Sequence, residues 1–266
     1  MSFKRETRRM TSPRQPLSRR SFLARASVVT AAAAVATLPF SEYLASPAYA
    51  AGRYAEPKDV RDAARRALAR EKRTRSGKPS PNGWEMELTT DKGGKVWTRP
   101  VPGTPIEGVT VRIGEVETVL VHVIRRFHYE VEELRKGDVV GWRSPSSVGR
   151  RLPEANQASG TAVQIRPGHY PSGVKGGFFA PQQLVIRDIL AELEGVVRWG
   201  GDDRKPDESL FYIDVKPDSP LLAKIVAKLR GWEKEPGKGA GAPVDVLSGK
   251  RRDAAKALAR EQKAAA

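Results

Sequence analysis

This chain of 266 residues has no cysteine, so its three histidines and its carboxylates are the first candidates for metal binding or catalysis. His169 precedes a cluster of acidic residues: Asp202, Asp203, Asp207 and Glu208. One histidine with several carboxylates could hold a metal ion weakly. The simpler interpretation is that Asp202 and Asp203 cap the turn that follows Gly200–Gly201.

The other two histidines, His122 and His128, fall in a segment with helical periodicity. A histidine on such a helix is more often a packed or surface residue than a ligand. Ser159 lacks the G-x-S-x-G context of a serine nucleophile, and no His/Asp partner can be assigned to it from the sequence. None of these residues defines an active site alone.

Two motifs and an upstream segment define a second set of residues. The first motif, NQASGTAVQI, begins at Asn156, and the second, RWGGDDRKPDESLF, begins at Arg198. Upstream, GWRS begins at Gly141. Together they resemble the zinc D-Ala-D-Ala carboxypeptidase and dipeptidase family of the VanX/VanY type, whose fold is shared with the hedgehog signalling domain. The resemblance extends from about Val119 to Trp232.

The resemblance assigns roles to particular positions. The family motifs, S-x-H-x-x-G-x-A-x-D and then D/E-x-x-H, supply two histidines and an aspartate to zinc. Gln157, Gln164 and Leu210 stand at those three positions here. Asp207 matches the general base, and Arg143 matches the arginine that faces the substrate carbonyl or carboxylate.

These substitutions favour a domain that has kept the fold without the metal and without the activity. Leu210 has no donor atom, and the two glutamines offer only neutral amide oxygens, which are weak zinc ligands. Without zinc, a water molecule keeps its ordinary high pKa, which the metal would lower to about 7. We therefore expect no cofactor and no catalytic role for Asp207. We expect Arg143, Gln157, Gln164 and Asp207 to bind the substrate. The two glutamines could hydrogen-bond to each other or to Asp207.

The elements that must position these residues follow from periodicity and capping. Helices are predicted at 56–73, from 115 to about 131, at 181–194, 219–232 and 249–263. Strands are predicted at 109–113, 138–144, 160–165, 196–201 and 209–215. Because helices and strands mix without regular βαβ repeats, the fold class is α+β. The resemblance implies a single hedgehog/DD-peptidase-like domain, with a small antiparallel sheet and flanking helices.

Composition suggests where the domain begins and ends. Residues 51–83 are predicted to be a basic helix and a linker, 84–232 the peptidase-like domain, and 233–266 a second linker and basic helix. The helical sequences RDAARRALAREK and RDAAKALAREQK, which begin at Arg61 and Arg252, are nearly identical. Each has a narrow apolar face of mostly alanine, which predicts solvated terminal helices or basic arms that contact an anionic polymer.

The first fifty residues have the three parts of an export signal: a basic region, an apolar run and a small-residue site ending at Ala50. SRRSFL, from Ser18, resembles the twin-arginine signature, so we expect the twin-arginine translocase as a partner during export. A membrane anchor is less favoured, because the apolar run is shorter than the roughly 20 residues that span a bilayer. No other apolar run is long enough to span.

The formal net charge is +16, and it is +10 once residues 1–50 are removed. With an export signal and no nucleic-acid motif, this charge points to an anionic envelope polymer rather than to nucleic acid. Three hypotheses follow for an exported or wall-associated protein. It is a non-catalytic binder of peptidoglycan stem peptide or of a protein partner, an active metallopeptidase with relocated ligands or a metal-independent hydrolase, or a scaffold that uses its basic arms.

Overall fold

The computed structural model describes residues 58–149 and 152–264. The chain divides into two compact units, residues 1–62 and 63–266. The expected export signal lies outside the described residues. The first unit is therefore represented only by residues 58–62, and the description below concerns the second.

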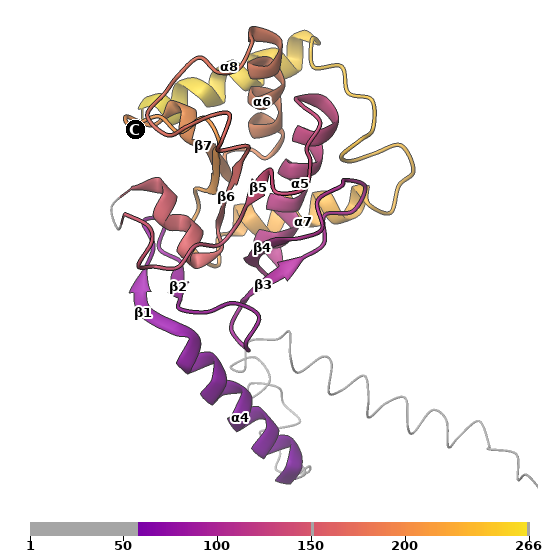
Figure 1. The fold of residues 1–266 in the computed structure, drawn as a ribbon. Coiled ribbons are helices and arrows are strands. Elements are labelled where there is room, and N and C mark those ends of the chain that lie inside the picture. Colours follow the sequence, from indigo (N-terminus) through magenta and orange to yellow (C-terminus); the bar gives the residue numbers. More distant parts are fainter. Residues whose placement is uncertain (1–57, 150–151, 265–266) are drawn as a thin grey trace, which may run out of the picture. The chain divides into compact units, whose positions relative to one another are not determined.

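The structure is α+β, with small antiparallel sheets, as predicted (Figure 1). The helices are α4 (Lys58–Thr74), α5 (Glu115–Glu130), η1 (Pro153–Ser159), α6 (Ala180–Glu192), η2 (Gly200–Asp202), α7 (Pro220–Trp232) and α8 (Gly249–Ala264). The strands are β1 (Arg75–Pro79), β2 (Glu85–Glu87), β3 (Val96–Arg99), β4 (Val109–Arg112), β5 (Val139–Val140), β6 (Ala162–Ile165), β7 (Val197–Trp199) and β8 (Leu210–Ile213). Each predicted strand contains an observed one, and each predicted helix overlaps an observed one.

The central sheet has the strand order β5-β6-β8-β7, and each neighbouring pair is antiparallel. In its register, Gln164 on β6 lies opposite Leu210 on β8 and opposite Val140 on β5. Two separate ribbons, β1-β2 and β3-β4, complete the strands. The register therefore places Gln164 beside Leu210, two of the residues that the motifs single out.

Helix α5 forms the centre of the core. Its buried stripe recurs every three or four residues, as an amphipathic helix requires, and consists of Val116, Val119, Leu120, Val123, Ile124 and Phe127. Phe127 makes edge contacts with Phe178 and with Phe211 of β8, at centroid distances of 5.9 and 6.1 Å. Helix α5 also packs on α6 and α7, so one helix joins the sheet to the helical layer.

Residues 75–83 are part of the folded domain, contrary to the predicted linker. Strand β1 pairs with β2, and Asn82 then reaches the central sheet. The Asn82 side-chain amide donates to the Thr161 hydroxyl and to the Ile213 carbonyl, both at 2.8 Å. Composition rich in Gly, Pro and Ser indicated a linker, but long-range hydrogen bonds hold the segment in place.

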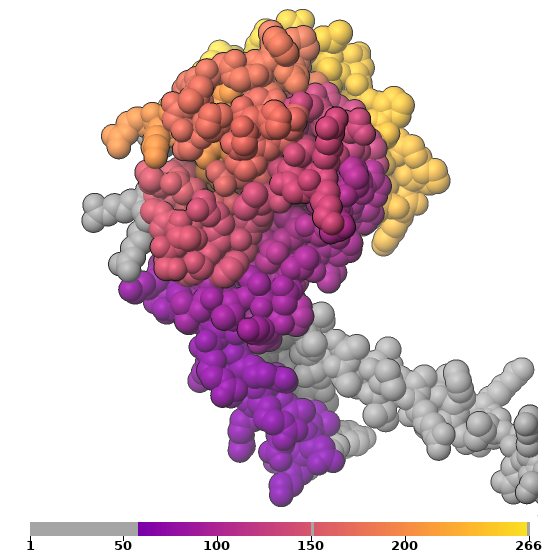
Figure 2. All heavy atoms as spheres, viewed as in Figure 1, coloured from indigo at the N-terminus to yellow at the C-terminus, as the bar shows by residue number. Residues whose placement is uncertain are grey.

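Helix α8 packs on α6, so it is not a peripheral arm. Ala255 and Gln262 are buried, and the Gln262 amide donates to the Val197 carbonyl at 3.0 Å. Arg198 of β7 in turn donates to the Gln262 carbonyl at 2.7 Å. Figure 2 shows the yellow C-terminal segment lying against the body of the domain. The domain therefore extends well beyond residue 232.

Charged side chains form a buried network where α5, α6 and α8 meet. Arg126 is 1 % exposed and makes ion pairs with Glu130, Asp188 and Glu192. Arg251 of α8 binds Asp188 at 2.6 Å and Glu192 at 3.0 Å. The network ties the last helix to the core through paired charges, which avoids burying an isolated one.

His122 of α5 completes this network through a 2.8 Å contact between its Nε2 atom and Glu192. Burial alone would raise the pKa of Glu192, but the hydrogen bond from His122 and the charge of Arg126 lower it to about 2. A carboxylate with a lowered pKa stabilises the fold above its unfolded-state pKa of about 4.5. That stability is lost as the pH falls from about 4.5 toward 2.

Replacing Glu192 by glutamine is therefore expected to flatten the acid dependence of stability. Between pH 6 and pH 3 this one group accounts for about 2 kcal/mol of unfolding free energy. Urea denaturation of the wild type and E192Q at both pH values measures the difference. The exposed pair partner Glu107, changed to glutamine, is the control, and an unchanged pH dependence in E192Q would contradict the assignment.

Among the described residues, no helix is both long and apolar enough to cross a bilayer.

Candidate functional site

The residues singled out by the two motifs lie in one place, at the centre of the β5-β6-β8 surface. Gln164 and Leu210 lie directly opposite each other on adjacent strands. Gln157, on η1, donates from its side-chain nitrogen to the carbonyls of Val140 and Gly141, at 3.2 and 2.9 Å. Val140 is the cross-strand partner of Gln164, so Gln157 lies close to the strand position next to Gln164.

Asp207 joins this group through its side chain. Its Oδ2 accepts a 2.9 Å hydrogen bond from the Gln164 amide, so the expected hydrogen bond between these two residues is present. Its Oδ1 accepts from the Ser209 hydroxyl at 2.6 Å and from the Ser209 amide at 3.1 Å. Among the described residues, no cation forms an ion pair with Asp207, so its partners are neutral donors.

All four residues are buried: Gln157 is 0 %, Leu210 1 %, Asp207 3 % and Gln164 9 % exposed. The Gln157 Oε1 atom is buried and, within the part of the chain described, has no hydrogen-bond partner. Rotating the amide by 180° would not help, because the nitrogen already donates to two carbonyls. An unpaired buried acceptor is costly, so this oxygen is the atom in the group best suited to accept a further hydrogen bond.

The residues that flank the ligand positions hold η1 in place. The Ser159 hydroxyl lies 2.9 Å from that of Ser80 and 2.8 Å from that of Thr161. The Asn156 side chain accepts from the Asn82 amide at 3.1 Å. These contacts require neither a metal nor a substrate.

Gly160 ends η1 in the left-handed conformation, with φ 69°. A Cβ atom at this position would lie 2.7 Å from the Arg112 amide nitrogen and 2.9 Å from a Val96 methyl. G160A is therefore expected to destabilise the domain by about 2–4 kcal/mol, since backbone strain and overpacking combine. Thermal and urea unfolding measure it, with G168A, which meets no atom within 4 Å, as the control.

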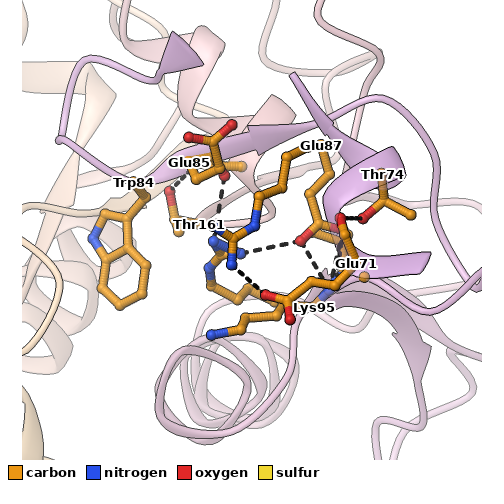
Figure 3. Close-up of polar contacts among 12 residues, drawn as sticks. Glu71, Thr74, Trp84, Glu85, Glu87, Lys95 and Thr161 are labelled. Atoms are coloured by element: carbon orange, nitrogen blue, oxygen red, sulfur yellow. Dashed lines mark hydrogen bonds and ion pairs between the residues drawn. The ribbon is translucent and has the colours of Figure 1, made fainter. Parts of the chain in front are cut away.

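Strands β2 and β4, which both contact η1, are joined by a buried ion pair (Figure 3). Glu87 accepts from the amides of Lys95 and Val96, and it pairs with Arg112 at 3.4 Å. The Arg112 guanidinium also lies over the Trp84 ring, 5.4 Å from its centroid. Burial lowers the pKa of Arg112 from its ordinary value. The backbone amide of Arg112 donates to the Gly160 carbonyl, so the ion pair also helps to hold the end of η1 in place.

Arg143 is half-buried on the loop that follows β5. Its guanidinium donates to the Ser147 carbonyl at 3.2 Å, the only hydrogen bond of this side chain within the described residues. The preceding Trp142 is anchored by hydrogen bonds to the Glu87 and Ala158 carbonyls, both 3.2 Å. The structure thus brings together Gln157, Gln164, Asp207 and Leu210, and it records no direct contact of Arg143 with them.

His169 and the acidic residues do not form a shared site. His169 is exposed and contacts Arg166 at 2.9 Å. Asp202 pairs with Arg187, and Asp203 accepts from the Tyr212 hydroxyl at 3.0 Å. Both oxygens of Glu208 accept from backbone amides, those of Gly176 and Gly177. Within the described ranges, no group of three or more His, Asp or Glu residues could hold a metal ion.

The sequence interpretation missed Ser80, Asn82 and Ser209 as contributors to this place. Asn82-Gly83 was an available signal, because Asn-Gly favours a tight turn between strands and β1-β2 is such a ribbon. Ser209 had no comparable signal, since its contact with Asp207 depends on a local turn before β8.

In comparisons with known proteins, no protein-family model, no curated protein and no solved structure matches this chain.

Proposed function

We propose that this chain is an exported envelope protein with a fold of the hedgehog/DD-peptidase type, which binds a peptide without cleaving it. One observation carries the proposal. The three positions at which related zinc peptidases would hold their metal converge here as Gln157, Gln164 and Leu210, next to the general-base position Asp207. The resemblance predicted that convergence, although two of the residues are 46 positions apart.

The arrangement is suited to hydrogen bonding rather than hydrolysis. Gln157 has an unused buried acceptor, and Asp207 accepts only from neutral donors among the described residues. Because both acceptors are buried, an extended peptide can donate its amide N–H groups to them only after the segments that cover them move apart. Arg143, half-buried on the adjacent loop, would pair with a peptide carboxylate, and a peptidoglycan stem peptide ends in one.

The test uses the chain from Ala51 onward and two measurements. Calorimetry with zinc after chelation is expected to show no binding tighter than millimolar, and incubation with a muropeptide pentapeptide is expected to release no D-alanine. Titration with the same pentapeptide is expected to give a measurable Kd that is at least tenfold weaker in R143Q. Stoichiometric zinc with turnover, or a folded protein that binds no muropeptide, would contradict the proposal.

A second candidate function, binding of an anionic envelope polymer, is favoured by helix α4. The helix carries seven Lys or Arg residues and three acidic ones, and none of its residues before Thr74 is buried. Its near-duplicate α8 is docked on α6, so only α4 presents this sequence to solvent along its length. Arginine pairs well with phosphate, whereas the helix has none of the large aromatic residues that favour insertion into a bilayer.

Binding to long-chain inorganic polyphosphate, a soluble phosphodiester mimic, tests this second function. We expect binding at low salt that weakens steeply by 0.3 M NaCl, and a loss of at least tenfold in R61Q/R65Q/R66Q/R70Q. A matched variant with four exposed loop cations neutralised, K175Q/R204Q/K205Q/K216Q, should lose far less. Equal losses in the two variants would show that only net charge matters.

A further inference from the structure

A cavity of about 580 Å³ lies away from the motif residues, between α5, the C-terminal end of α7 and the loop at 233–240. Figure 1 shows α5 and α7 side by side, with the segment that leads from α7 to α8 passing beyond them. The apolar part of its wall consists of Pro100, Pro102, Val121, Leu229, Trp232 and Pro236. This volume is in the range of small-molecule sites, about 300–1,000 Å³.

Arg125 of α5 is the residue of this wall that has a buried side-chain donor without a partner among the described residues. It is half-buried, and its guanidinium donates to the Ala240 carbonyl at 3.2 Å. Its Nε atom is buried and has no hydrogen-bond partner within the described residues. The described part of the chain also offers Arg125 no carboxylate at ion-pair distance. A guanidinium in this state leaves several donors for an incoming acceptor.

Of the three carboxylates in the same wall, two are paired with cations, and the third has no such partner in the part of the chain that the structure describes. Glu117 pairs with Arg99 at 2.6 Å, and Glu235 pairs with Lys238 at 2.5 Å. Glu233 has no ion-pair partner among the described residues, so its charge opposes a dianion in the cavity. Lys234 in the same wall also has no ion-pair partner among the described residues, so Arg125 and Lys234 together face one unpaired carboxylate. The resulting charge of +1 fits a singly charged carboxylate better than a phosphate dianion.

The remaining wall residues define the body of the ligand. The Trp232 ring is half-buried and lies 6.2 Å from the ring of His122, centroid to centroid. The Nε2 atom of His122 is engaged by Glu192, so Nδ1 is the nitrogen that remains for a ligand. Two rings and several prolines around a volume of this size suit a compact apolar or aromatic group.

We infer that this cavity is a second binding site, which takes small monocarboxylates with a compact apolar or aromatic body, their carboxylate held by Arg125 and their body packed on Trp232. The site is independent of the Gln157–Asp207 group and of any peptide bound there.

Ligand-observed NMR and calorimetry with benzoate, 3-phenylpropionate and indole-3-acetate test the site in the chain from Ala51 onward. At least one probe is expected to bind with a Kd of about 1 mM or below, since fragments of this size reach such affinities. Its neutral amide and phenylphosphate should bind at least tenfold more weakly. R125Q and W232A should each weaken binding tenfold or more, while R143Q, which lies outside the cavity, should bind as the wild type does.

R125K keeps the positive charge but loses the planar guanidinium that can bind a carboxylate through two donors, so its affinity for the probe should be intermediate. Its unfolding temperature shows whether the variant is folded. Failure of all three carboxylates at millimolar concentration would overturn the inference. Equal binding of carboxylate and amide, or full binding by folded R125Q, would overturn it as well. The muropeptide titration of R143Q reports on the other site, so the two results can be separated.

Discussion

The triple variant Q157H/Q164D/L210H is expected to bind one zinc ion with a Kd below about 1 µM, whereas we expect no tight zinc binding by the wild type. Two imidazoles and a carboxylate are ordinary zinc ligands, and structural zinc sites contribute roughly 10–16 kcal/mol. The backbone already places these positions together, because residues 164 and 210 face each other and residue 157 contacts the partner strand. Calorimetry with zinc measures the change.

The metal-free triple variant should also be less stable than the wild type. Aspartate at position 164 removes the amide that donates to Asp207 and places a second carboxylate beside it. Two adjacent carboxylates repel each other, so zinc should raise the unfolding temperature of the triple variant far more than that of the wild type.

The double variant Q157H/Q164D, which keeps Leu210, is the matched control. With only two ligands it should bind zinc at least 100-fold more weakly than the triple variant. A folded triple variant that binds no better than the double would mean that the three positions do not converge in solution. The proposed relation to zinc peptidases would then lose its geometric support.

Replacing Arg126 by alanine is expected to destabilise the domain by about 3–5 kcal/mol, because Asp188 and Glu192 would lose a buried partner. Arg251, which is 32 % exposed, would remain beside both carboxylates, and His122 would remain beside Glu192. Urea unfolding at pH 7 measures the loss. The exposed pair of Lys136 and Glu107 provides the comparison, since K136A should cost about 1 kcal/mol or less.

Arg126→Met separates charge from packing in the same experiment. Methionine fills much of the arginine volume, so R126M should recover part of the loss if packing contributes, and none if the unpaired carboxylates dominate. If R126A lowers the free energy of unfolding by no more than K136A does, the prediction is wrong, and the network around the buried Arg126 contributes little to stability.

The sequence was sufficient for elements whose periodicity is determined by burial. The α5 stripe from Val119 to Phe127 and the alternation in β4 predicted a helix and a strand that the structure confirms. Local patterns carry such information because side chains on one face repeat at 3.6 or 2 residues. The grouping of Gln164, Asp207 and Leu210 came instead from the resemblance to zinc peptidases, and in the structure these residues are neighbours.

Non-local contacts account for what the sequence did not reveal. Asn82 belongs to the domain because it bonds residues 79 and 131 positions away, which no local composition indicates. Helix α8 is docked by Arg251, a residue just outside the segment it shares with α4. The position that matches Arg251 in α4 is Val60, so the two similar helices differ at a residue that anchors α8 to the core.

The docking of α8 makes the charge balance of the core depend on a residue that lies far along the chain. Asp188 and Glu192 of α6 pair with Arg251, which lies 63 and 59 positions further on. Contacts between distant residues form late in folding, because a long loop must first be closed. Until α8 docks, Asp188 and Glu192 lack this partner, so partly folded molecules carry two carboxylates that the native state buries against Arg251.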